Sequence, residues 1–178
     1  RDEQPFVVHV QFADGGEGRI DARAVIDASG TWQTPNPAGA DGLPALGELA
    51  AVEAGALSYG IPTSESAAAF GGEHVVVVGN GHSAATAITL LAPVVREAPG
   101  TRVSWVLRRG LVGNTFGGGT ADELPERGAL GQRAKQAVDD GLVDLVTGFR
   151  TEQILHEDGR VVLVAEDGRR LDPAARVF

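Results

Sequence analysis

The sequence predicts an α/β fold in which a parallel-sheet unit lies between two antiparallel β-hairpins. A run of β-branched residues at 74–78 leads through a glycine-rich turn into an apolar helix, a pattern typical of a strand buried on both faces of a parallel sheet. The flanking stretches, 6–28 and 152–165, each contain two strand patterns separated by an Asp-Gly turn. Together these patterns divide the chain into a central α/β unit and two hairpins.

The N-terminal hairpin is predicted from β-rich runs at 6–12 and 19–28. Beyond it the pattern weakens between 31 and 72, where four prolines stand among many glycines and alanines. This segment is expected to hold at most short turns of helix. A loop of this length is unusual inside a compact domain and indicates a crossing between two domains. The predicted divisions are therefore 1–34, a linker at 35–73, the central unit at 74–148, and a returning hairpin at 149–178.

The central unit alternates strands and helices. The helix after the first strand carries Ala84, Ala87, Ile88 and Leu91 at helical spacing, and Pro93 is expected to end or kink it. The remaining elements are predicted as a strand at 101–107, a glycine-rich loop at 111–120, a helix at 126–139 and a strand at 142–146. Another strand pattern begins at 176–178.

Composition excludes several functions. The 178 residues carry a net charge of −9, which disfavours nucleic acid as a partner. The absence of cysteine rules out disulfides, thiolate metal sites and dithiol redox chemistry. No apolar run approaches the roughly 20 residues of a membrane helix, and no signal-like N-terminus is present, so a cytoplasmic protein is expected. The chain contains no methionine, even at position 1. We therefore interpret the chain as an excised piece of a longer protein.

A dinucleotide-binding fingerprint follows the first strand of the central unit. It reads Gly79-Asn80-Gly81-His82-Ser83-Ala84 and opens the apolar helix, which is the context that a Rossmann-type G-x-G-x-x-A motif requires. Gly79 permits the sharp turn, Gly81 permits close approach of a pyrophosphate, and Ala84 permits close packing of the helix on the strand. The first N–H groups of the helix would then face the anion.

Arg108 and Arg109 follow the next strand, where a carboxylate would hold the ribose 2′-hydroxyl of NAD. Two guanidiniums at this position suit the dianionic 2′-phosphate of NADP. The sequence therefore predicts NADP as the cofactor.

No catalytic or metal-binding residue is predicted. His82 stands where a side chain faces solvent or the edge of the ligand, and the other histidines lack metal-ligand spacing. The serines lack a G-x-S-x-G setting, which excludes a hydrolase of that type.

Two segments carry a family resemblance. The sequence VIDASGTW at 25–32 resembles the A-T-G segment of two-dinucleotide flavoproteins, with Ser29 in place of the usual threonine. GNGHSA followed by VLRRG is similar to the NADPH fingerprint and arginine pair of pyridine-nucleotide flavoprotein reductases and flavin-containing monooxygenases. The order of segments also matches over nearly the whole chain. The resemblance implies that Ser29 and Gly30 lie against an FAD, and that the Rossmann unit is inserted between hairpins of a truncated FAD domain.

The resemblance also shows which parts of the family pattern are missing. An early G-x-G-x-x-G for the FAD and a Cys-x-x-Cys pair are both absent. Residues 70–74 have the wrong spacing for the Baeyer–Villiger signature. These absences leave the monooxygenase-like and simple-reductase branches open.

The predicted function is the NADPH-binding portion of an FAD-dependent oxidoreductase, monooxygenase-like, which delivers hydride from NADPH to flavin for use on a small-molecule substrate. Three alternatives stay open: a flavin reductase serving a protein carrier, a non-catalytic nucleotide-binding module, and, less favoured, a methyltransferase. The 178-residue chain alone is expected to be colourless and inactive.

Overall fold

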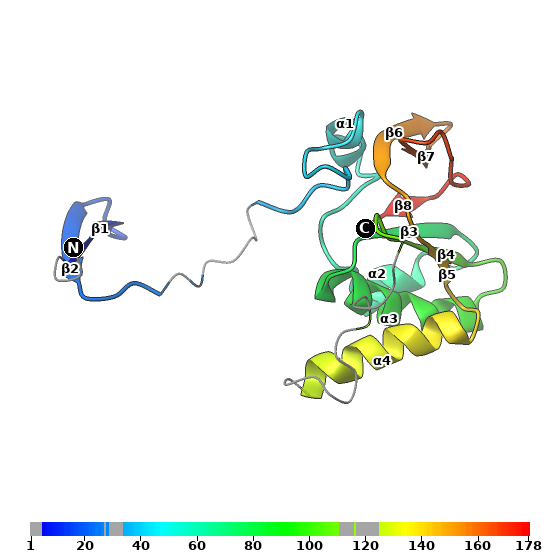
Figure 1. The fold of residues 1–178 in the computed structure, drawn as a ribbon, viewed down its shortest axis with the longest axis horizontal. Helices are drawn as coiled ribbons and strands as arrows, with labels where there is room; N and C mark the ends of the chain where they lie inside the picture. The colour runs from blue at the N-terminus through cyan, green and yellow to red at the C-terminus, as the bar shows by residue number, and fades with distance from the viewer. Residues whose placement is uncertain (1–4, 27, 29–33, 111–115, 117–124) are drawn as a thin grey trace. The chain divides into compact units, whose positions relative to one another are not determined.

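The computed structural model describes residues 5–26, 28, 34–110, 116 and 125–178. It divides into two compact units, Arg1–Pro35 and Asn36–Phe178 (Figure 1). The second unit has the predicted α/β architecture, with a four-stranded parallel sheet, helices and an antiparallel hairpin.

The first unit is a hairpin of β1 (Phe6–Gln11) and β2 (Glu17–Ala22). Its turn is closed by the Phe12 N–H, which donates to the Gly16 carbonyl at 2.7 Å. β2 ends at Ala22 and not at residue 28 as predicted, because Ala22 is already opposite Phe6, the first residue of β1. Residues beyond Ala22 therefore have no partner on β1, and the apolar side chain of Ile26 is 92% exposed.

The parallel sheet has the strand order β5-β4-β3-β8. Its strands are β3 (His74–Val78), β4 (Arg102–Val106), β5 (Asp144–Val146) and β8 (Arg176–Val177). The strands predicted for the central unit are thus confirmed, and the C-terminal strand pattern joins the same sheet beside β3. β3 is an inner strand of this sheet, and the chain passes from it through α3 to the neighbouring strand β4. Because β3 and β4 are parallel, their carboxyl ends lie side by side.

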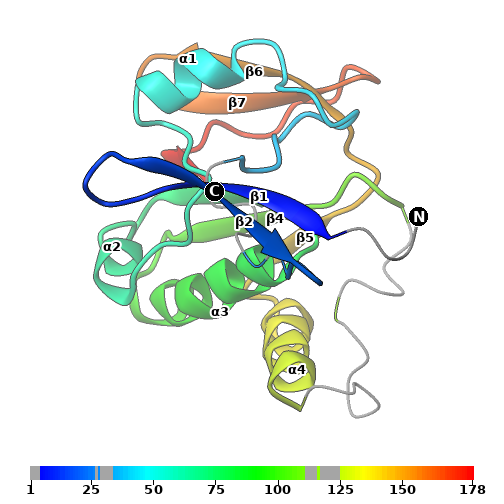
Figure 2. The same ribbon diagram turned by 90° about the vertical axis from the view of Figure 1, so that its left-hand side faces the viewer.

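One face of the sheet is covered by α2 (Ser64–Ala68), α3 (His82–Glu97) and α4 (Pro125–Asp139) (Figure 2). Ile88 and Leu91 of α3 pack there with Trp105 in a fully buried core. α3 continues through Pro93 to Glu97, so the helix does not end at that proline, which was one of the two outcomes predicted from the sequence. Ala92 and Val94 on either side of Pro93 are buried in the core, and this burial offsets the backbone hydrogen bond that a proline cannot make.

The opposite face is covered by α1 (Glu48–Glu53) and by the hairpin of β6 (Thr151–Glu157) and β7 (Arg160–Ala165) (Figure 2). Asp158 and Gly159 join the two strands with φ angles of 49° and 75°, the left-handed conformations of a tight hairpin turn. Leu163 and Val76 share a second core between hairpin and sheet.

The hairpin therefore forms a layer over the parallel sheet and is not one of its strands. Residues of the predicted linker also enter the two cores, through Leu57 on one face and Ala67 on the other. The structure thus joins 36–178 in one compact unit. The assignment of 149–178 to an FAD-domain side, like the other divisions drawn from the sequence, stays a prediction.

Within the described part of the chain, no helix has the length and apolar character needed to cross a membrane. The same residues contain no group of three or more His, Asp or Glu side chains able to hold a metal ion.

Candidate dinucleotide-binding site

The predicted fingerprint lies at the carboxyl end of β3, in the turn that leads into α3. Gly79 has a φ of +116°, which side-chain-bearing residues rarely adopt. Gly81 is extended, with φ −88° and ψ 179°, and is the residue before the helix. Apart from the two chain neighbours, no atom of a described residue lies within 4 Å of the position that a β-carbon would take on either glycine. The backbone of this turn is therefore open to a ligand.

The amino end of α3 has the form of an anion site. The first N–H of the helix with an intrahelical partner is that of Ala85, which donates to the Gly81 carbonyl at 3.1 Å. The N–H groups of His82, Ser83 and Ala84 precede it and have no partner within the helix. Because Gly81 has no side chain, it supplies no capping oxygen. These N–H groups and the helix dipole can therefore act together on an anion.

The side chains of the fingerprint divide by burial. Asn80, His82 and Ser83 are exposed. Ala84 is 7% exposed and packs in the core beneath α3, as its proposed packing role requires. The structure thus brings all six residues of the motif into one strand–turn–helix unit.

Trp105 of β4 fixes this turn, and sequence reasoning missed it. Its indole Nε1 donates to the Gly79 carbonyl at 2.7 Å, and the Gly79 N–H donates to the Val106 carbonyl at 3.0 Å. The Trp105 ring is fully buried and meets Phe116 edge-on, with centroids 5.7 Å apart. The available signal was the tryptophan within a buried strand, because a buried indole N–H must find an acceptor.

Arg108 and Arg109 follow β4, and Val78 of β3 is paired with Val106, so both arginines lie near the fingerprint turn in the fold. The two arginines are held differently. Arg108 Nη1 donates to the Ala40 carbonyl at 3.1 Å, while its side chain stays largely exposed. The Arg109 guanidinium makes no hydrogen bond to a described residue, although the Arg109 carbonyl accepts from the Gly148 N–H at 3.1 Å.

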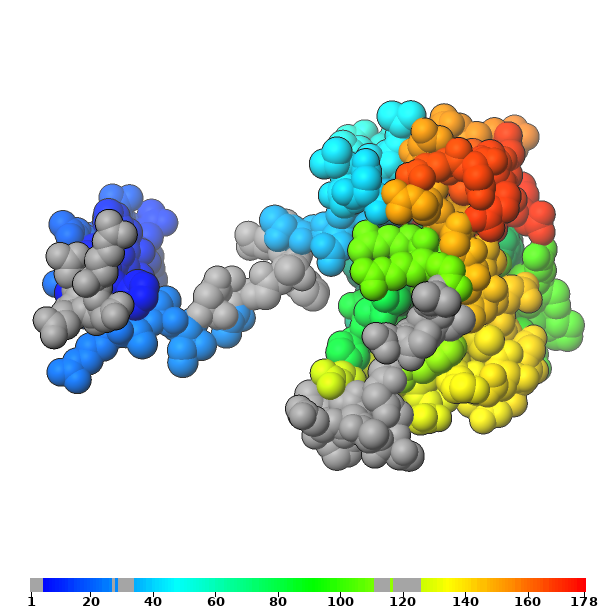
Figure 3. Space-filling model, viewed as in Figure 1, coloured from blue at the N-terminus to red at the C-terminus, as the bar shows by residue number. Residues whose placement is uncertain are grey.

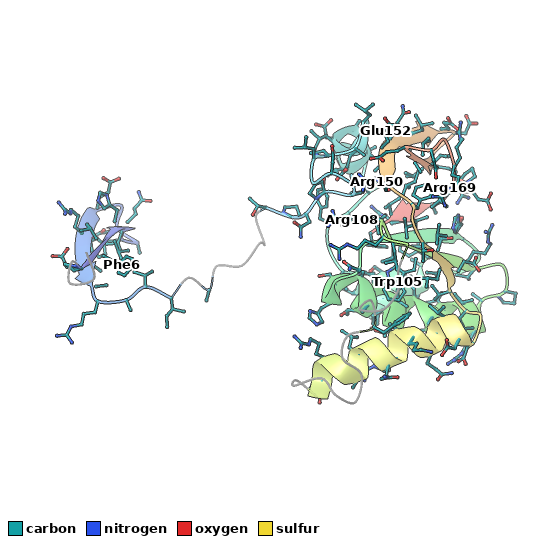
Figure 4. All side chains as sticks on the ribbon, viewed as in Figure 1. Phe6, Trp105, Arg108, Arg150, Glu152 and Arg169 are labelled. Carbon is teal, nitrogen blue, oxygen red and sulfur yellow. The ribbon has the colours of Figure 1, made fainter. Side chains whose placement is uncertain are left out.

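The surface at the end of β4 lies beside the segment that precedes α1 (Figure 3), and Arg108 stands between α1 and the buried Trp105 (Figure 4). The Ala40 carbonyl that holds Arg108 is 68 residues away in the sequence. No sequence pattern indicates such a backbone contact.

Ser29 and Gly30, predicted to lie against an FAD, fall outside the described residues. Their role stays a prediction.

His74 and Ser104 form the buried polar pair of the sheet. His74 Nε2 lies 2.9 Å from the Ser104 hydroxyl, and Nδ1 lies 3.2 Å from the Pro173 carbonyl. Burial lowers the pKa of His74 below its ordinary value. His74 is the first residue of β3 and Ser104 lies in the middle of β4, both away from the fingerprint turn, so we assign the pair a structural role.

No family model matches the sequence, and no curated protein matches it. Solved structures that it resembles include a Cu(II) complex of a mutant of the HOCl-induced flavoprotein disulfide reductase RclA from Escherichia coli, with a TM-score of 0.48 and 15% identity over 98% of this chain and 33% of that one. Bacillithiol disulfide reductase Bdr from Staphylococcus aureus has a TM-score of 0.45 and 18% identity over 63% of this chain and 29% of its own. Putidaredoxin reductase, in a covalent complex with putidaredoxin, has a TM-score of 0.38 and 19% identity over 59% of this chain and 22% of its own. This chain thus spans a third or less of each.

Proposed function

We propose that this chain is the NADPH-binding portion of an FAD-dependent oxidoreductase. The observation that carries the proposal is the turn from β3 into α3, where two glycines leave the backbone open in front of N–H groups that have no partner within the helix. This is the arrangement that binds the pyrophosphate of a dinucleotide.

The residues of the site fit NADPH. Backbone N–H groups of His82, Ser83 and Ala84 would hold the pyrophosphate, and Arg108 and Arg109 would hold the 2′-phosphate by charge-assisted hydrogen bonds. Arginine is suited to this task because its planar guanidinium meets phosphate oxygens in pairs. The bound cofactor would supply hydride to a flavin, and this chain would bind and orient it.

The finer part of the proposal is a monooxygenase-like activity. It rests on the likeness of the fingerprint and the arginine pair to those of flavin-containing monooxygenases. In the longer protein, oxygen consumption coupled to oxygenation of a small molecule would support it. NADPH oxidation that needs a protein carrier would favour the flavin reductase instead. A colourless full-length protein that binds NADPH without oxidising it would favour a binding module.

The NADPH assignment is tested by calorimetric titration of this chain with NADPH and NADH. We expect tighter binding of NADPH. Replacing both Arg108 and Arg109 with alanine removes contacts worth about 1.5–3 kcal/mol each in good geometry, so NADPH affinity should fall at least about tenfold while NADH affinity stays the same. The matched control is Arg133→Ala, an exposed arginine of α4. Equal losses for the two dinucleotides would contradict the assignment.

A further inference from the structure

The segment that holds Arg108 is itself fastened to the hairpin on the same face of the sheet. The Ala40 N–H donates to the Thr151 carbonyl at 3.0 Å. At the other end of the segment, Leu46 exchanges two backbone hydrogen bonds with β6, through the Glu152 carbonyl at 2.9 Å and the Ile154 N–H at 2.8 Å. The Ala40 carbonyl is therefore a fixed acceptor for Arg108.

Glu48, the first residue of α1, accepts hydrogen bonds from this segment through its buried side chain. It has no exposed surface. Its Oε1 accepts from the Ala38 N–H at 2.9 Å and from the Tyr59 hydroxyl at 2.7 Å, and its Oε2 accepts from the N–H groups of Ala45 at 2.7 Å and Gly39 at 3.2 Å. A buried carboxylate is tolerated only when it is hydrogen-bonded in this way. Burial, followed by the hydrogen bond to Glu48, raises the pKa of Tyr59 to about 12.

Gly39 shows how closely this loop is folded around the carboxylate. A β-carbon on Gly39 would stand 2.0 Å from the Leu43 carbonyl oxygen and 2.9 Å from the Ala45 nitrogen. Any side chain at position 39 would therefore push the loop open, and Ala40 is the next residue.

We propose that Glu48 is a positioning residue for dinucleotide selectivity, because it fixes the loop whose Ala40 carbonyl orients Arg108 toward the 2′-phosphate of NADPH. This inference rests on the proposed function and assigns the selection of the cofactor to the loop around Ala40. Of the five N–H donors of a guanidinium, the bond to Ala40 uses one and leaves the others for phosphate oxygens. An arginine already held in one conformation loses less entropy on binding than a mobile one.

The test measures dissociation constants of NADPH and NADH for wild type, Glu48→Gln, Gly39→Ala and Arg108→Ala. In Glu48→Gln, either orientation of the amide turns an NH₂ group toward at least one backbone donor, so the loop must shift. We expect NADPH affinity to fall about three- to tenfold in Glu48→Gln and Gly39→Ala, the range for a side chain that loses its fixed conformation, with NADH affinity unchanged. Glu53→Gln, at the exposed end of α1, is the matched control and should change neither constant.

If Glu48 has a merely structural role, the folded variant should bind NADPH and NADH both more weakly, or both as tightly as wild type does. Either result overturns the proposal. The double variant Glu48→Gln/Arg108→Ala should bind NADPH no more weakly than Arg108→Ala alone, because the first change acts through the second. Additive losses would also overturn it. If Glu48→Gln does not fold, Gly39→Ala makes the same comparison. A wild-type chain that binds neither dinucleotide, or both equally, would instead contradict the proposed function.

Discussion

The indole Nε1 of Trp105 donates a 2.7 Å hydrogen bond to the carbonyl oxygen of Gly79, and so ties the fingerprint turn to the neighbouring strand. Replacing Trp105 with phenylalanine removes the donor and leaves the Gly79 carbonyl unpaired. We expect the free energy of unfolding to fall by at least about 1–3 kcal/mol, and NADPH affinity to fall because the turn is less fixed. Denaturant unfolding and NADPH titration measure the two effects.

The control for Trp105→Phe is Leu91→Ala, which removes a fully buried side chain from the second half of α3, away from the fingerprint turn. It should cost about 2–5 kcal/mol of stability and leave NADPH affinity unchanged. If both variants weaken binding alike, the Trp105 effect is a general loss of stability and the hydrogen bond to Gly79 has no special part in the site.

The two glycines of the fingerprint should respond to substitution in opposite ways. Gly79→Ala forces a side-chain-bearing residue to a φ of +116° and should cost about 1–3 kcal/mol of stability. Gly81→Val keeps an ordinary extended conformation, and its β-carbon would have no atom of a described residue within 4 Å, so it should cost at most about 1 kcal/mol through poorer capping. Its side chain nevertheless stands where the pyrophosphate must approach, so NADPH binding should be lost. A folded Gly81→Val variant that titrates normally would place the phosphate site elsewhere.

The fingerprint was predictable because its signals are local. The β-branched run at 74–78, the spacing of the glycines and the apolar face of α3 all lie within one short stretch, and the structure confirms strand, turn and helix there. The turn at Asp158 and Gly159 was predictable for the same reason.

What the sequence did not reveal depends on contacts between distant segments. β2 ends at Ala22 because of its register with β1, and the hairpin of β6 and β7 covers the sheet because the second core requires it. The anchoring of Arg108 by a backbone carbonyl and the burial of Glu48 are of the same kind. Neither has a pattern of residue types, because most of the partners are backbone atoms.

His74 predicts how stability depends on pH. Burial keeps its pKa below the ordinary value of 6.5, so the unfolded chain takes up a proton more readily than the folded one. The contribution of neutral His74 to the free energy of unfolding is fully present above pH 6.5 and is lost as the pH falls toward the lower pKa of the folded state. The melting temperature should therefore decrease on acidification below pH 6.5, and His74→Gln should flatten that decrease. His156→Gln, at an exposed position of β6, is the matched control for the substitution. An unchanged slope in His74→Gln would contradict this account.

The most direct test of the central claim is amide chemical-shift mapping of the ¹⁵N-labelled chain during titration with NADPH. If the fingerprint turn and the end of β4 form the site, the largest shifts should fall on Gly79 to Ala85 and on Arg108 to Gly110, and NADH should reproduce the first group but not the second. Saturable binding with shifts confined to other surfaces, such as the hairpin β6–β7 or the surroundings of His74, would contradict the account.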